Sequence, residues 1–263
     1  MAKPKVIVLR TAGTNCDMET AFAFESLGAN VDYVHINRLF KKEVKLIDYD
    51  LLALPGGFSY GDDVAAGRVL GNELKYRLYD EIKKFVKSGR LVIGICNGFQ
   101  VLVKCGLLPG YDIVDNKQYV TLAFNESDVF ECRWVHLKKS NSKSPFLKYV
   151  PEIIHLPIAH AEGKFITKNK KVLKYLIENK QIAFRYVDSD GNKGSYPINP
   201  NGSIEDIAGI CNEQGTVLGM MPHPERYLHF YQHPEWTSMK KEKYGHGYYI
   251  FQSAMEYLKK KKR

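Results

Sequence analysis

The fold is set by residues 91–105, LVIGICNGFQVLVKC, where a short apolar run leads through a glycine-flanked cysteine into a second apolar segment. An apolar run without alternation is typical of a strand buried on both faces, as in a parallel sheet. In the pattern Gly-x-Cys-x-Gly, Gly94 and Gly98 leave the space that a nucleophile held in a strained turn needs around Cys96. The stretch therefore predicts a strand, a nucleophile turn and a helix whose N-terminus favours the Cys96 thiolate. Alone, it also fits a small buried cysteine in a glycine-rich turn.

The same organisation extends toward the N-terminus. Strand-like runs at 6–9, 31–36 and 51–54 alternate with helix-like segments at 16–27 and 72–86. Strands of this kind alternating with helices predict an α/β fold with a doubly wound, mostly parallel sheet.

The pattern changes after Pro109, where β-like runs are separated by turn-forming residues and predict antiparallel additions to the sheet. A hairpin is expected from strands at 207–211 and 217–220, and a last helix at 247–258 with a basic tail fraying beyond it. No linker or repeat marks a boundary, so we expect one domain over residues 1–263, ending in a helix and tail at about 246–263. The remaining β-like runs lie at 119–124, 129–137, 153–157 and 183–187.

Composition and charge exclude several classes of protein. The formal net charge is +9, and five positive charges lie in the tail at 259–263. Six lysines between 164 and 180 resemble a solvated surface more than a nucleic-acid module, although an anionic partner stays open. No targeting segment is visible, and no apolar run approaches the roughly 18 residues that span a bilayer. We therefore expect a cytoplasmic protein with reduced cysteines and with neither membrane nor nucleic acid as a partner.

A base for the cysteine is offered by His223-Pro224-Glu225, which follows the second hairpin strand. The side chains of His223 and Glu225 share a side if this stretch is extended. Glu225 could then fix the imidazole tautomer while His223 accepts and returns a proton. The alternative is an ordinary turn histidine between two prolines.

Backbone donors are offered by Pro55-Gly56-Gly57, at the end of a predicted strand. Acyl transfer places negative charge on oxygen, and each backbone amide that stabilises it can contribute roughly 3 to 4 kcal/mol. We assign this role to the amides of Gly57 and Asn97. An ordinary strand-to-loop turn is the alternative.

Together, the three motifs resemble the class I, or triad, glutamine amidotransferases, whose pattern is Pro-Gly-Gly, Gly-x-Cys-x-Gly-x-Gln and His-x-Glu. The resemblance implies that Cys96 attacks the glutamine amide, that His223 is base and acid, and that Glu225 orients His223. It also implies that Gly56 and Gln100 bind the substrate glutamine.

Further segments are similar to the branch that supplies ammonia to phosphoribosylformylglycinamidine synthase in purine synthesis. This resemblance implies hydrolysis of glutamine to glutamate and ammonia, delivered to a large ATP-dependent synthetase subunit, with a small accessory subunit in the complex. ATP and magnesium are expected on the synthetase, and no cofactor on this chain, which has no Gly-x-x-x-x-Gly-Lys-Ser/Thr loop. The segments are 58–62, 130–134, 158–165, 199–203 and 220–226.

Two rival functions and several residues stay outside this assignment. The rivals are another cysteine hydrolase on a similar fold and a basic protein that binds nucleic acid. We treat His160 and Glu162 as non-catalytic, and the spacing of the other histidines predicts no zinc or other metal site. The other cysteines are expected to be inert and buried, namely Cys16, Cys105, Cys132 and Cys211.

Overall fold

The computed structural model describes residues 2–110 and 118–261, and its centre is a nine-stranded sheet in the order β2-β1-β3-β4-β11-β10-β9-β6-β7. The strands from β2 to β11 pair in parallel, and those from β11 to β7 pair antiparallel. The α/β fold with a mostly parallel half and antiparallel additions is thus confirmed. The strands are β1 Lys5–Arg10, β2 Asn30–His35, β3 Leu51–Leu54, β4 Leu91–Ile95, β6 Glu131–Lys139, β7 Ile153–His160, β9 Ile182–Val187, β10 Ile207–Cys211 and β11 Val217–Met220.

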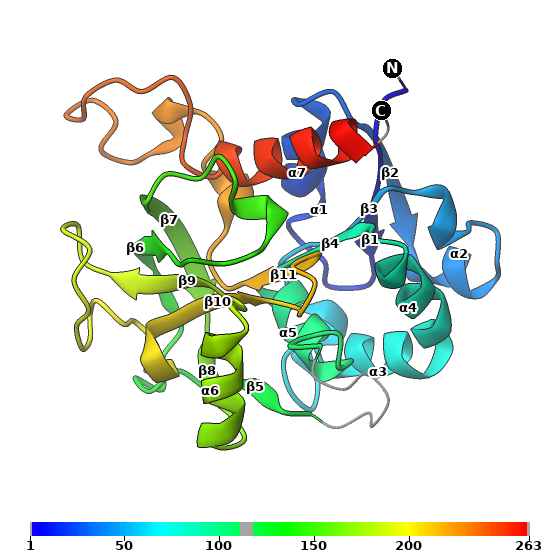
Figure 1. The fold of residues 1–263 in the computed structure, drawn as a ribbon, viewed down its shortest axis with the longest axis horizontal. Coiled ribbons are helices and arrows are strands. Elements are labelled where there is room, and N and C mark those ends of the chain that lie inside the picture. Colours follow the sequence, from blue (N-terminus) through cyan, green and yellow to red (C-terminus); the bar gives the residue numbers. More distant parts are fainter. Residues whose placement is uncertain (1, 111–117, 262–263) are drawn as a thin grey trace.

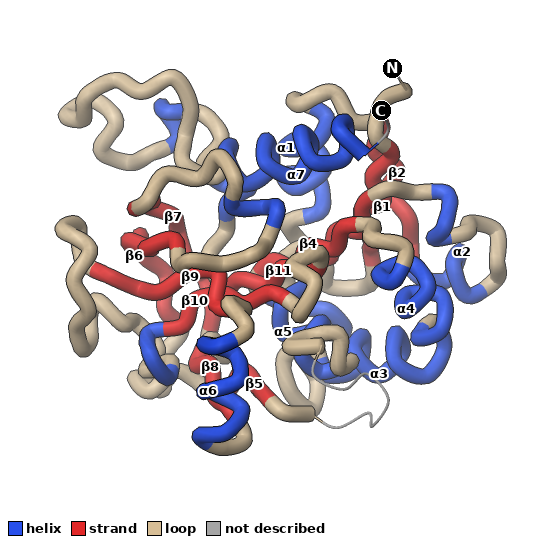
Figure 2. Tube along the Cα trace, viewed as in Figure 1, coloured by secondary structure: helices blue, strands red, loops and turns tan. Residues whose placement is uncertain are grey.

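Helices cover both faces of the parallel half, as a doubly wound sheet requires (Figures 1 and 2). In Figure 1, α1 and α7 lie above the sheet while α3 and α5 lie below it. The α-helices are α1 Asp17–Glu25, α2 Ile36–Phe40, α3 Arg68–Arg77, α4 Tyr79–Lys87, α5 Asn97–Lys104, α6 Lys170–Glu178 and α7 Tyr248–Lys261.

The buried apolar side chains form one cluster through the sheet and its helices. Strands β3 and β4 are buried along their whole length, which explains why their sequences show no alternation. In α5, Phe99, Val101, Leu102 and Val103 are all buried, so this helix packs into the core directly behind Cys96. In the described part of the chain, no helix is long and apolar enough to cross a membrane.

Three predictions about elements need correction. The helix expected at 72–86 is two helices, because Leu78 leaves the helical conformation at φ −126° and ψ 6°. The last helix continues to Lys261, so the basic tail does not fray at 259. The lysine-rich segment contains a strand and a helix, neither of which is expected from its sequence. These are β8 Lys164–Thr167, which pairs antiparallel with β5 Val120–Ala123, and α6.

Most lysines of that segment are nevertheless solvated, as expected. Lys168, Lys170, Lys171 and Lys174 are exposed, whereas Val172 and Leu176 turn the apolar side of α6 inward. The lysine enrichment is therefore compatible with an ordinary amphipathic helix.

Candidate active site

The turn at Cys96 has the strained geometry that its sequence predicts. Cys96 lies between β4 and α5 with φ 51° and ψ −107°, a conformation that L-residues rarely adopt. A Cβ at position 94 would lie 2.6 Å from the Gly98 oxygen, and one at position 98 would lie 1.9 Å from the Leu54 oxygen. Both flanking positions therefore require glycine. The Cys96 side chain is almost fully buried, with Sγ 3.5 Å from the Ala159 oxygen.

The topology brings His223 to the same edge of the sheet. Strand β11 pairs in parallel with β4, with Met220 opposite Ile95, so the carboxyl ends of both strands lie side by side. The chain then enters a 3-10 turn, Pro224–Arg226, and the His223 amide donates to the Pro157 oxygen at 2.9 Å. Two segments far apart in the sequence thus place a thiol and an imidazole at one site.

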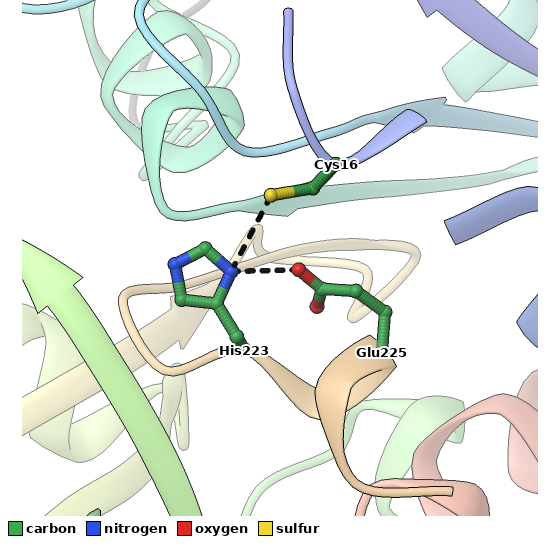
Figure 3. Close-up of side chains that lie close together, drawn as sticks. All are labelled: Cys16, His223 and Glu225. Atoms are coloured by element: carbon green, nitrogen blue, oxygen red, sulfur yellow. Dashed lines mark hydrogen bonds and ion pairs between the residues drawn. The ribbon is translucent and has the colours of Figure 1, made fainter. Parts of the chain in front are cut away.

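The imidazole is held by the carboxylate expected to orient it. Nδ1 of His223 lies 2.6 Å from Oε1 of Glu225, and both side chains are buried (Figure 3). Burial alone would lower the pKa of His223, but the charges of Glu225 and Cys96 outweigh it and hold that pKa well above its usual value. An imidazolium is therefore favoured at His223, and its buried Nε2 has no hydrogen-bond partner among the described residues.

The glycines after β3 lie against this pair. A Cβ at position 56 would lie 2.8 Å from Cε1 of His223, and Gly57 has φ +139°. The Phe58 amide donates to the Gly13 oxygen at 2.8 Å, which fixes the loop. Helix α5 begins at Asn97, so the amide of Asn97 has no carbonyl within the helix to bond. Both amides assigned to the oxyanion thus belong to backbone that borders Cys96, and their role stays a prediction.

A small cavity of about 40 Å³ lies at this edge, with room for about one water molecule. Gln100 borders this cavity. Its Nε2 donates to the backbone oxygen of Glu162 at 2.7 Å, and its Oε1 accepts from Nδ2 of Asn97 at 2.9 Å. Gln100 is therefore tied to both Asn97 and Glu162 at the wall of this cavity. The lining residues are Gly57, Phe58, Asp62, Ala66, Cys96, Gln100, Ala159, His160, Ala161 and Glu162.

Two carboxylates in this lining were not expected to bind the loop over the cavity. Asp62 accepts from Nδ2 of Asn97 at 2.9 Å, and burial raises its pKa. Both carboxylate oxygens of Glu162 accept from the Ala66 amide, at 3.2 and 3.3 Å. Tyr60 and Asp62 have positive φ, so the loop is held in a strained form. In the sequence, residues 58–62 stand out only through their resemblance to the purine-synthesis branch of the amidotransferases.

His160 also borders the cavity. Its Nδ1 lies 3.0 Å from Oδ1 of Asn125, and its buried Nε2 has no hydrogen-bond partner among the described residues. Burial and the charge of His223 lower the pKa of His160 to about 3, so its ring is neutral. A neutral ring held by Asn125 is compatible with a non-catalytic role.

One cysteine contradicts the expectation of burial, and another has an unexpected neighbour. Cys132 is exposed, because it lies on β6 where alternate side chains face solvent. Cys16 is buried as expected, but its Sγ lies 4.0 Å from Nδ1 of His223 and accepts from Nη2 of Arg226 at 3.2 Å (Figure 3). The spacing of residues along the chain gave no sign that Cys16 is a neighbour of His223.

Comparisons with known proteins agree with this geometry. Residues 3–258 match the model of the CobB/CobQ-like glutamine amidotransferase domain. The chain is 45% identical over 271 residues to phosphoribosylformylglycinamidine synthase subunit PurQ of Methanococcus maripaludis strain C7, covering 98% of both chains. It is 43% identical over 260 residues to the subunit of that name from Dehalococcoides mccartyi, covering 98% of this chain and 99% of that one. A structure of PurLQS from Thermotoga maritima matches with a TM-score of 0.73 and 35% identity, over 98% of this chain and 100% of that one.

Proposed function

The chain belongs to the CobB/CobQ-like glutamine amidotransferase family, and from this premise we propose that it is the glutaminase subunit of phosphoribosylformylglycinamidine synthase. The observation that carries the proposal is the buried His223–Glu225 pair beside a strained Cys96 at the carboxyl ends of β4 and β11. The high identity to PurQ subunits over nearly the whole chain supports the assignment to purine synthesis.

The first half-reaction releases ammonia. The Cys96 thiolate attacks the side-chain amide carbon of glutamine, and the amides of Gly57 and Asn97 stabilise the resulting oxyanion. The imidazolium of His223 donates its proton to the leaving nitrogen, so ammonia departs and a glutamyl thioester remains on Cys96.

The second half-reaction restores the enzyme. Neutral His223 takes a proton from water, which attacks the thioester carbonyl, and glutamate leaves as the Cys96 thiolate re-forms. Glu225 holds the proton on Nδ1 throughout, so the other ring nitrogen stays available for proton transfer. Gly56 and Gln100 contribute to holding the substrate.

Ammonia released into bulk water would be protonated and lost. We therefore assign it to a large ATP-dependent synthetase subunit that converts formylglycinamide ribonucleotide to its amidine, with a small accessory subunit completing the complex. ATP and magnesium belong to the synthetase in this assignment. The name PurLQS of the matching structure supports an assembly of this kind.

The test measures glutamate release from glutamine by wild type and by Cys96→Ala. Each is assayed alone and with the synthetase and accessory subunits, ATP and formylglycinamide ribonucleotide. Cys105→Ala is the matched control, because Cys105 is buried away from the cavity lining, and burial raises its pKa to about 12. We expect release that needs Cys96, survives in Cys105→Ala and rises with the partners. Release by Cys96→Ala at the wild-type rate, or none in the full mixture, would refute the proposal.

A further inference from the structure

The cysteine beside His223 belongs to a compact group of metal-binding side chains. Sγ of Cys16, a ring nitrogen of His223 and a carboxylate oxygen of Glu225 lie within 4.8 Å of one another, and all three residues are buried (Figure 3). Cys16 comes from the segment before α1, and it is 207 positions from His223. Sequence spacing, which predicted no metal site, could not reveal a group assembled over this distance.

The separations are close to those of a zinc site. Thiolate, imidazole and carboxylate are the ligands that Zn²⁺ takes, and ordinary bond lengths in a tetrahedron place sulfur about 3.6 Å from nitrogen and nitrogen about 3.4 Å from oxygen. Here, Sγ of Cys16 is 4.0 Å from Nδ1 of His223, which is 2.6 Å from Oε1 of Glu225. Shifts below about 1 Å would therefore bring these two separations to those of a zinc site.

One further observation points to a ligand at this group. Oε2 of Glu225 is buried and has no hydrogen-bond partner among the described residues, although buried carboxylate oxygens are normally satisfied. Position 56 must be glycine for this group to form, because a Cβ there would lie 2.8 Å from Cε1 of His223 and 3.3 Å from Sγ of Cys16. Burial raises the pKa of the Cys16 thiol, so the cation must displace a bound proton from Sγ, and the charge of Arg226, which donates to that sulfur at 3.2 Å, opposes the cation.

We propose that Cys16, His223 and Glu225 form an inhibitory site for Zn²⁺ or a divalent cation of similar ligand preference. The cation replaces the proton on Nδ1 of His223 and the proton on Sγ of Cys16, and both protons pass to solvent. The other ring nitrogen then keeps its proton and cannot accept one from the water that hydrolyses the thioester. Inhibition rests on the proposed glutaminase function, whereas metal binding does not.

The experiment measures binding in the absence of catalysis. Cys96→Ala removes the nucleophile as a competing ligand, and it is titrated with Co²⁺, whose thiolate complexes have a charge-transfer absorption. Zn²⁺ affinity is then obtained by competition with a chromophoric chelator. We expect Cys96→Ala to show the thiolate band, and Cys96→Ala/Cys16→Ala to lose it and bind Zn²⁺ at least tenfold more weakly. The matched control, Cys96→Ala/Cys105→Ala, should retain both the band and the affinity.

Equal affinity in Cys96→Ala and Cys96→Ala/Cys16→Ala would overturn the proposal. It would assign the metal to other donors, such as His155 and His233, whose ring nitrogens lie 2.9 Å apart. A second readout covers a loss of folding: Zn²⁺ should raise the Tm of Cys96→Ala relative to EDTA, and the shift should vanish in Cys96→Ala/Cys16→Ser. If Zn²⁺ binds through Cys16 while wild type hydrolyses no glutamine with its partners, the metal site stands and the proposed function fails.

Discussion

Replacing Glu225 by glutamine tests the electrostatics of the site, because the variant keeps the shape of the side chain and removes its charge. The carboxylate accepts a 2.6 Å hydrogen bond from Nδ1 of His223, and both groups are buried. Charges about 4 Å apart at an effective dielectric of about 20 attract each other by about 4 kcal/mol. Losing that attraction to the imidazolium corresponds to roughly a thousandfold lower rate, at 1.36 kcal/mol for each factor of ten.

The assay is glutamate release with the partner subunits across a range of pH. The pKa of His223 is held well above its usual value, with Glu225 the largest of the favourable charges, so His223 loses its proton on the alkaline side of the profile. In Glu225→Gln that pKa falls, and the alkaline limb should move to lower pH as kcat drops about a thousandfold. Glu19→Gln is the control, because Glu19 is a half-exposed partner of Arg226 at 3.2 Å and should change kcat less than about fivefold. Wild-type activity in folded Glu225→Gln, or an unmoved alkaline limb, would refute the reasoning.

Three further predictions concern the turn, the loop and a buried histidine. Gly98→Ala places a Cβ 1.9 Å from the Leu54 oxygen and should lower the free energy of unfolding in urea by more than the control Gly106→Ala. At Gly106, φ is +83° and no atom lies within 4 Å of the added Cβ, so only backbone strain of about 1 to 2 kcal/mol acts there. Equal losses in the two variants would contradict the steric argument. Asn97→Ala removes the side chain that accepts from the Ser59 amide and donates to Asp62 and Gln100. The KM for glutamine should therefore rise about tenfold, with a smaller change in kcat. A fall in kcat alone would show that these contacts do not serve substrate binding. Burial lowers the pKa of His160 to about 3, so the stability contributed by the neutral ring is complete above the unfolded pKa near 6.5 and is lost as pH falls toward 3, by up to about 1.4 kcal/mol per pH unit. His160→Gln should flatten this part of the pH dependence of urea unfolding. An unchanged slope would assign the pH dependence to other groups.

The parts of the fold that could be predicted depend on local signals. Strands β3 and β4 are buried on both faces, so their apolar sequences match their observed bounds, and the hairpin β10–β11 is marked by its turn residues. The helix break at Leu78 was missed because the surrounding apolar pattern continues across it. Strand β8 and α6 were missed because their lysines dominate the composition while only a few apolar side chains, such as Phe165 and Leu176, face the core.

The sequence by itself determined the sheet type, the nucleophile turn and the candidate triad. A strained turn excludes side chains at Gly94 and Gly98, and that requirement is written in adjacent residues. Only the tertiary structure decided that Cys16 lies against His223, that Asp62 accepts from Asn97, and that Glu162 accepts from the Ala66 amide of the loop. Those contacts join segments that are distant in the chain. They arise because β4 pairs in parallel with β11 and because the segment before α1 bonds to the loop after β3, so these segments meet at one edge of the sheet.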